Sequence, residues 1–284
     1  LTLDLNGNTV EGTDTITGSF GLITNKGNLT VKNGTITLKA ENNRGWNAYS
    51  SVISNTVGGN LVVENVTIEH LGGTDMAYGI DNLTNGKGTS AVANINDGAV
   101  VKSCYRAIRQ FLNGIEATNE LYVNPGAVVE GANKSIWMQD PSKNANTGKL
   151  VVNKDATLKG NAYLTVTEGS TEWPVEVSIA TSSLAEGSEV MWNANVPEGY
   201  KVVEKNGAWT VLQYAEVASA DELVAALEAN KDVIFTEGIK INPAGMSNAY
   251  GTTGINVKYG QTIDGNDHTL DIKGAGGTWD SGIN

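Results

Sequence analysis

Cysteine is nearly absent: the 284 residues include only Cys104, so no disulfide can form within the chain. Stability must therefore come from a packed core, in which Cys104 is expected to be a small buried residue. Long apolar runs are absent too, so no transmembrane segment is predicted. The first residues show no secretion signal, although the chain begins at Leu1 and a leader could lie upstream.

Positive charge is scarce. The chain has 19 Lys and Arg residues against 31 Asp and Glu residues, which gives a net charge of -12 and a pI near 4.6. Phosphate binding needs a basic surface, so this balance argues against a nucleic-acid partner and against an anionic membrane.

Residues that carry proton-transfer chemistry are also few. The two histidines are His70 and His268, and no two aspartates are adjacent in the chain. Hydrolases and lyases that act on polysaccharides need clustered acidic residues with a basic partner, or paired carboxylates that act as acid and base. No catalytic residue is predicted, and a non-enzymatic role is favoured.

A repeat of nearly fixed length is the most informative feature that is present. Ile53, Ile80, Ile108 and Ile136 recur at intervals of 27 or 28 residues, each in a short strand-like run. Fixed-period self-similarity is typical of a coiled repeat fold. A second strand in each repeat alternates apolar and polar residues, which places its apolar side chains on one buried face. Pairs that favour a tight bend interrupt it, namely Asn33-Gly34, Asp97-Gly98 and Pro125-Gly126.

Many short strands separated by turns fit either an antiparallel sandwich or a parallel β-helix. In a β-helix, residues one repeat apart stack about 4.8 Å from each other, so like residues meet. The isoleucines show this likeness, and so does a polar column of Asn55, Asn82 and Gln110. An all-β parallel β-helix is therefore predicted. The amides of the column either form an inward ladder or bond the backbone at a corner, and both interpretations are open.

A short amphipathic helix near residues 219–230 is predicted to cap a stack of coils. Ser219 and Glu222 form a capping box, and Asp221 lies near the positive end of the helix. The apolar stripe that follows would close the end of a core that otherwise exposes side chains and strand edges. A starting cap so far along the chain implies that one β-helix ends and another begins.

The position of that helix predicts that the chain is divided into two domains. Residues 1–213 are predicted to form β-helix coils that end in a β-hairpin over residues 197–212, with its turn at Asn206-Gly207. Residues 214–284 are predicted to hold the capping helix and the first strands of a second unit. At an offset of 260 residues the start of the first domain aligns with the second without a gap, which indicates tandem copies. The matched pairs are Thr2/Thr262, Leu3/Ile263, Asp4/Asp264, Asn6/Asn266 and Thr9/Thr269.

Two stretches carry a resemblance to a known family: VASADELVAALEANKDVIFTEG at 217–238 and QTIDGNDHTLDI at 261–272. They resemble the cap and first strands of the pectin-lyase-like superfamily of single-stranded right-handed parallel β-helices, especially the non-catalytic, adhesin-like tandem surface proteins of gut bacteria. The resemblance covers nearly the whole chain. It implies a right-handed solenoid, an extracellular or cell-surface location, glycans or host and bacterial surface proteins as partners, and a monomer within a tandem array.

One outward column predicts a ligand site. The residues that follow three of the stacked isoleucines are Asp81, Arg109 and Trp137, which are expected to point outward on adjacent coils. Polar groups there would hydrogen-bond sugar hydroxyls while the indole covers an apolar sugar face. Tyr78 and Tyr105 lie near the same edge and complete the predicted carbohydrate site. The structural alternative, which is favoured, is an Asp81–Arg109 ion pair with Arg109 stacked on Trp137, contributing about 1 kcal/mol at an exposed site.

A metal site receives no such support. Asp264, Asn266 and Asp267 resemble part of a calcium loop, but no acidic bidentate partner follows them at the required spacing. A complete calcium site takes six or more oxygen ligands. These residues are expected to form a turn, and neither a metal nor another cofactor is predicted.

Three functions stay open. The favoured one is a non-enzymatic extracellular surface repeat, structural or adhesive, that presents a long regular face to glycans or partner proteins. The first alternative is a polysaccharide lyase or glycoside hydrolase of the β-helix type. Arg106-x-x-Arg109 is weakly similar to an arginine-containing segment of pectate lyases, but the accompanying motif residues are absent. The second alternative is a phage fibre or tailspike-like protein, usually an intertwined trimer with a wide apolar strip.

Overall fold

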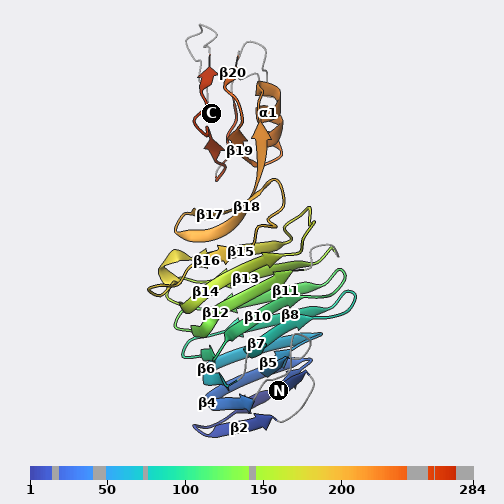
Figure 1. The fold of residues 1–284 in the computed structure, drawn as a ribbon, viewed down its shortest axis with the longest axis vertical. Helices are drawn as coiled ribbons and strands as arrows, with labels where there is room; N and C mark the ends of the chain where they lie inside the picture. Colours follow the sequence, from blue (N-terminus) through green and yellow to red (C-terminus); the bar gives the residue numbers. More distant parts are fainter. Residues whose placement is uncertain are drawn as a thin grey trace. The chain divides into compact units, whose positions relative to one another are not determined.

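The computed structural model describes residues 1–14, 19–40, 49–72, 76–140, 145–241, 255–258 and 260–272. They belong to two compact units, seen in Figure 1. The first comprises residues 1–198 and 202–211, and the second comprises residues 199–201 and 212–284. The domain boundary predicted between residues 213 and 214 lies inside strand β18 (Ala208–Val217), where the units divide after Val211.

Short strands make up most of the first unit. In chain order they are β1 (Thr2–Asp4), β2 (Thr9–Asp14), β3 (Phe20–Asn25), β4 (Asn28–Ala40), β5 (Ser50–Asn55), β6 (Gly59–Leu71), β7 (Ala77–Thr84), β8 (Ser90–Ile95), β9 (Val100–Ser103), β10 (Arg106–Leu112), β11 (Thr118–Val123), β12 (Val128–Asp140), β13 (Thr147–Val152), β14 (Thr157–Val166), β15 (Val175–Ala180) and β16 (Val190–Trp192). A 3-10 turn, η2 (Thr181–Ser183), precedes β16, and β17 (Tyr200–Lys205) leads into β18. The second unit then contains α1 (Ala220–Glu228), β19 (Asp232–Phe235), β20 (Ile239–Ile241), β21 (Ile263–Asp264) and β22 (Leu270–Ile272).

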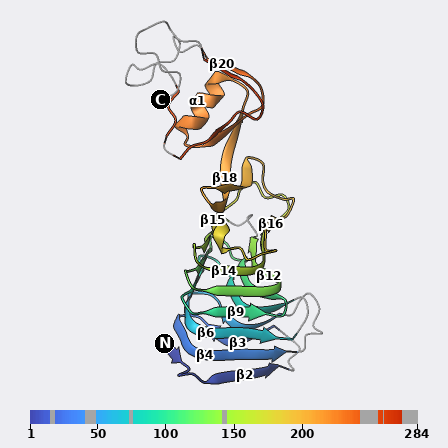
Figure 2. The same cartoon turned by 90° about the vertical axis from the view of Figure 1, so that its left-hand side faces the viewer.

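Strands one coil apart pair in parallel and in register, as a β-helix requires. Ile53 on β5 lies beside Ile80 on β7, which lies beside Ile108 on β10 and then Ile136 on β12. The solenoid has about 8 turns. Figure 2 shows the strands of the first unit lying one above another. The predicted parallel β-helix is confirmed, and the antiparallel sandwich is excluded.

A second buried apolar column runs along the next strand of each coil. Val63, Ile95, Val123 and Val152 lie in register on β6, β8, β11 and β13, each at most 1% exposed. β-Branched side chains suit these strands because they are stiff and pack well on a pleated surface. Burying each one contributes about 1.5–3 kcal/mol, so the two columns supply much of the stability.

Tight bends shape each coil, and two predicted turns form in different ways. At Asp97-Gly98 the chain leaves β8 and enters β9, with Gly98 at φ 69°. At Asn33-Gly34, β4 bends but continues, with Asn33 at φ 59°. Gly34 is required there because a Cβ would lie 2.5 Å from both the Asn8 carbonyl oxygen and the Leu5 Cβ.

Cys104 lies at the surface, where its thiol contacts the Gly72 carbonyl oxygen at 3.0 Å. The expectation of a buried cysteine is therefore wrong. Residue 104 falls in the bend between β9 and β10, so it occupies no inward strand position.

Buried asparagines form a ladder along the solenoid. The Asn25 side-chain amide donates to Asn55 Oδ1 at 2.8 Å, that of Asn55 to Asn82 Oδ1 at 2.7 Å, and that of Asn82 to Asn119 Oδ1 at 2.7 Å. All four residues are at most 6% exposed. Because buried amides need partners, each rung satisfies two groups that water does not reach.

Gln110 completes the predicted polar column but does not extend the ladder. It lies in register with Asn82, as expected. Its side-chain amide donates to the backbone carbonyls of Asn119 and Lys149 at 3.0 and 2.7 Å. Both open interpretations therefore hold: the asparagines bond one another, whereas Gln110 bonds the backbone.

Removing one rung of the buried ladder should destabilise the first unit. Asn82→Ala leaves the side-chain amide of Asn55 and the side-chain Oδ1 of Asn119 without these partners in a buried site. The expected loss is about 2–4 kcal/mol, because two desolvated groups lose a hydrogen bond. Equilibrium denaturation measures it.

Asn124→Ala is the matched control for that variant. Asn124 forms the same kind of rungs, to Asn96 at 2.7 Å and from Asn153 at 2.9 Å, but in a partly buried position. Water can replace these partners, so the expected loss is below about 1 kcal/mol. Equal losses of unfolding free energy in the two variants would show that the buried ladder stabilises the protein no more than the partly buried one.

The turn predicted for the hairpin is present between two strands. β17 and β18 are joined by Asn206 at φ 54° and Gly207 at φ 76°, the two left-handed residues of a tight hairpin turn. The start of β18 then pairs antiparallel with β15, with Ile179 beside Trp209. The parallel stack of coils thus ends on an antiparallel edge.

The predicted cap of the second unit is confirmed as α1. Ser219 Oγ accepts from the Glu222 N–H at 3.3 Å, and the Glu222 carboxylate accepts from the Ala218 N–H at 2.8 Å. The hydrogen bond from Ala218, followed by those from Ser219, lowers the pKa of Glu222. These bonds satisfy backbone donors that a helix start leaves unpaired.

The inner face of α1 covers the core of the second unit. Leu223 and Leu227 are at most 1% exposed and belong to one apolar cluster with Val233 and Phe235 of β19. The apolar stripe predicted from the sequence is therefore the packing face. In the described ranges α1 is the one α-helix, and its nine residues are too few to cross a membrane.

Candidate functional site

The strand register creates a column of side chains on the outward face of β3, β5, β7, β10 and β12. Its members, side by side, are Thr24, Ser54, Asp81, Arg109 and Trp137. The predicted stacking of the last three on adjacent coils is confirmed. Thr24 and Ser54 are absent from the predicted site; the same period extended back along the chain reaches Ser54, whereas Thr24 lies 30 residues before Ser54 and is found only from the strand register.

Asp81 and Arg109 form a buried bidentate ion pair. Arg109 donates from Nε to Asp81 Oδ1 at 2.8 Å and from Nη2 to Asp81 Oδ2 at 2.7 Å. Asp81 is 0% exposed and Arg109 is 4% exposed. The ion pair is as predicted, but the expectation that both residues face solvent is wrong.

Aromatic rings cover the Arg109 guanidinium. Its Cζ lies 4.8 Å from the centre of the Tyr49 ring and 4.7 Å from the centres of the Tyr78 and Phe111 rings. A cation that lies over ring faces keeps favourable electrostatics after water is removed. The rings therefore explain how a charged pair is buried on the outside of the coil.

Charge states in this cluster follow from the burial. Burial opposes the charged form of Arg109, but the Asp81 carboxylate outweighs it and raises the pKa of the guanidinium. Burial also raises the pKa of Tyr78 and of Tyr49. The guanidinium therefore stays charged and both phenols stay neutral at physiological pH.

Arg106, which is not in the predicted site, takes the position over Trp137. Its Cζ lies 4.1 Å from the centre of the Trp137 ring and 4.6 Å from that of the Tyr105 ring. An arginine does stack on Trp137, but it is Arg106 and not the predicted Arg109. Arg106 is 7% exposed, its Nη1 donates to Tyr78 Oη at 3.4 Å, and its Nε has no hydrogen-bond partner in the structure as described.

A second cation lies beside Arg106. Lys134 is in register with it on β12, and its ammonium lies 5.0 Å from the centre of the Tyr163 ring. Burial, and then the nearby charge of Arg106, lowers the pKa of Lys134. Neither cation forms an ion pair with a carboxylate among the described residues.

These residues define one surface feature, which we call the cationic aromatic cluster. Its rings are partly exposed, whereas the Arg106 side chain between two of them is buried. It consists of Tyr105, Arg106, Lys134, Trp137 and Tyr163.

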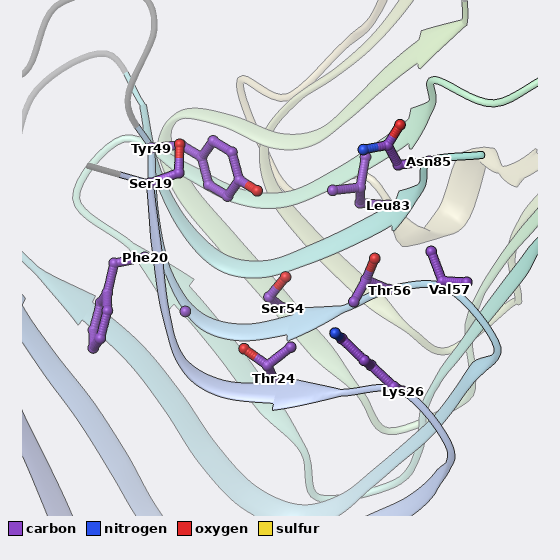
Figure 3. Close-up of a pocket in the computed structure, with 11 residues that line it drawn as sticks. Ser19, Phe20, Thr24, Lys26, Tyr49, Ser54, Thr56, Val57, Leu83 and Asn85 are labelled. Carbon is purple, nitrogen blue, oxygen red and sulfur yellow. The ribbon is translucent and has the colours of Figure 1, made fainter.

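A groove of about 500 Å³ lies over the other end of the column. In Figure 3, Tyr49 and Leu83 lie on one side of it and Thr24 on the other, with Ser54 and Thr56 between them. Hydroxyl groups and the two aromatic residues Phe20 and Tyr49 thus line the same open space. Rings and convergent polar groups are the usual composition of small-molecule sites.

Tyr49 joins the groove to the buried pair. Its ring lines the groove and also contacts the guanidinium of Arg109, which Asp81 holds by two hydrogen bonds. The pair thus fixes the position of a ring that a ligand can reach. In the predicted set, Asp81, Arg109 and Tyr78 are buried and can only position other groups, whereas Tyr105 and Trp137 are partly exposed.

Asp264, Asn266 and Asp267 form a turn in the second unit. The Asn266 N–H donates to Asp264 Oδ1 at 2.9 Å, and Asn266 and Asp267 have φ of 45° and 63°. Across the described ranges, no three His, Cys, Asp or Glu side chains gather closely enough to hold a metal ion.

Comparison of the chain with protein-family models, with curated proteins and with solved structures finds no match. The structure therefore shows a parallel β-solenoid and no particular family.

Breaking the buried ion pair on one side should cost more than removing it whole. Arg109→Leu leaves the Asp81 carboxylate buried without its counter-ion, for an expected loss of about 3–5 kcal/mol in unfolding free energy. In the double variant Asp81→Leu/Arg109→Leu no charge is stranded, so most of that loss should be recovered. Equilibrium denaturation of the three proteins measures the difference, and a double variant no more stable than Arg109→Leu contradicts it.

Proposed function

We propose that this protein is a non-enzymatic extracellular surface repeat, structural or adhesive, that binds glycans on the outward face of β3, β5, β7, β10 and β12. The observation that carries the proposal is the combination of accessible rings and hydrogen-bonding groups on that one regular face. Aromatic rings cover the apolar faces of sugars, while hydroxyls and cations bond sugar hydroxyls.

The ligand is longer than a single sugar. Ser54 in the groove and Trp137 in the cationic aromatic cluster lie in one register column, on β5 and β12. Three coil spacings separate them, roughly 14 Å at the usual distance between strands. A ligand that contacts both is therefore an oligosaccharide laid along the axis of the stack.

Acidic sugars are the preferred class. Arg106 and Lys134 are cations without acidic partners in the described ranges, on a chain whose net charge is -12. Hydrogen bonds to ionised groups are shorter and stronger than neutral ones, and arginine suits planar carboxylates. A carboxylate or sulfate on the glycan would supply the missing counter-charge.

The cell-surface part of the proposal is supported by the resemblance. The capping helix and the strand at 261–272 are similar to those of pectin-lyase-like tandem surface proteins, which also implies a right-handed coil. The match at an offset of 260 residues supports tandem units. Surface proteins of a host or of other bacteria are the second class of proposed partner.

Trp137→Ala and Tyr49→Ala should each weaken binding on an array of neutral and acidic glycans. Loss of one stacking ring costs about 1–1.5 kcal/mol, which is roughly a tenfold change in Kd. Tyr122→Ala is the control, because Tyr122 lies on β11, outside this face, and its loss should leave binding unchanged. Circular dichroism checks that each variant is folded.

Three outcomes would overturn the proposal. Full binding by both ring variants would reject the site. Reducing-end or unsaturated products from acidic polysaccharides would favour the lyase or hydrolase alternative. A trimer in sedimentation, where a monomer is expected, would favour the fibre alternative.

A further inference from the structure

One strand face of the first unit carries a column of charges that alternate in sign. It lies on β6, β9, β12 and β14, which are stacked one above another in Figure 2. Along the stack the column reads Glu69, Lys102, Glu130 and Lys159. Lys159 and Glu130 form an exposed ion pair with an N–O distance of 3.3 Å, whereas Glu69 and Lys102 form none in the described ranges. Glu69 and Lys102 are partly exposed, so their charges are open to a partner outside the chain.

An uncharged column runs beside the charges, two residues earlier on each strand. Its members, in register, are Thr67, Val100, Val128 and Thr157. The residues between the two columns, all 0% exposed, are Ile68, Val101, Val129 and Leu158. Because side chains alternate along a strand, both columns point outward. The face therefore has a valine at each of its two middle levels and a threonine at each end.

Both columns fit a copy of themselves that is turned end to end. A two-fold rotation about an axis along the strands, midway between β9 and β12, reverses the order of the levels and keeps each column in its lateral place. Lys102 then faces Glu130 of the second copy, and Glu69 faces Lys159 of the second copy. The uncharged column reads the same in both directions, so valine meets valine and threonine meets threonine. Such self-complementarity is what a two-fold interface between identical chains requires.

The even number of charges distinguishes this face from another one. A column on β11, β13 and β15 also alternates in sign, as Glu120, Lys149 and Glu176. It has three members, so its reversal places glutamate on glutamate and lysine on lysine. Two copies that run in the same direction at the same level would bring like charges together on either face. The charge pattern therefore favours one face and one orientation, because like charges across an interface are unfavourable.

We propose that the face of β6, β9, β12 and β14 binds a second copy of this chain in antiparallel orientation. Val100 and Val128 form its apolar centre, with the charge pairs beside them, as is usual in protein interfaces. This inference does not depend on glycan binding, which is proposed for another face.

The contact is weak when it forms alone. The face covers three coil spacings, roughly 14 Å at the usual distance between strands, and is smaller than the about 800 Å² per partner of a standard interface. A single unit therefore stays monomeric at micromolar concentration. In a surface array several such contacts would act together, which raises the overall affinity.

A charge swap between two variants tests the contact. Lys102→Glu places glutamate opposite Glu130 in its own dimer, and Glu130→Lys places lysine opposite Lys102. Each variant alone should associate at least about tenfold more weakly than the original chain, because like charges then meet in the interface. An equimolar mixture of the two restores every opposite pair and should associate as the original chain does. Small-angle X-ray scattering over a concentration series up to the millimolar range measures the dimer fraction.

Lys149→Glu is the matched control, because it reverses one charge of an alternating column outside the proposed contact. It should associate as the original chain does. Rescue in the mixture separates contact from folding, since one damaged coil does not repair another. Absence of a dimer of the original chain, or a mixture that associates no better than the separate variants, would overturn the inference. Glycan-array binding should be the same in all of these proteins.

Discussion

Parallel stacking in register is the constraint on which the first unit depends. Each residue lies beside the residue one coil earlier. Residues of the same kind must therefore be able to pack next to one another along every column. Apolar columns gain from it, and asparagine columns gain because an amide can donate to the next one. Repetition of one charge is unfavourable, and Glu69, Lys102, Glu130 and Lys159 alternate in register, whereas Arg106 and Lys134 are neighbours of like charge. Exposed pairs of this kind contribute at most about 1 kcal/mol, so alternation mainly avoids repulsion.

The parts of the fold that could be predicted from the sequence are those that stacking or local hydrogen bonds determine. The column from Ile53 to Ile136 is readable because like residues must meet at a fixed interval. The hairpin turn at Asn206-Gly207 and the cap at Ser219 are readable because their hydrogen-bond chemistry is local. Each of these features can be predicted from the repeat period or from a few neighbouring residues.

The candidate site was only partly predictable because side-chain coverage is not periodic. The register of Asp81 and Arg109 follows from the repeat, but their burial depends on rings that come from several coils, including Tyr49. Arg106 lies over Trp137, and β12 shifts register against β14 near Lys134, the neighbour of Arg106; neither feature follows from a fixed repeat. The result is a buried pair that positions a ring at the groove, and a cationic aromatic cluster in which Arg106 is buried between rings while Lys134 is partly exposed.

A disulfide between two coils tests the register most directly. Thr118 on β11 and Thr147 on β13 lie side by side at the surface, with their Oγ1 atoms 3.2 Å apart. In a Cys104→Ser background, Thr118→Cys with Thr147→Cys should form an intrachain disulfide in high yield under mild oxidation, because neighbouring strands lie within the Cα separation that a disulfide spans. Thr118→Cys with Lys149→Cys, displaced by two residues along β13, should not. Failure of the first pair to cross-link, or equal cross-linking of the second, would contradict the in-register parallel stack.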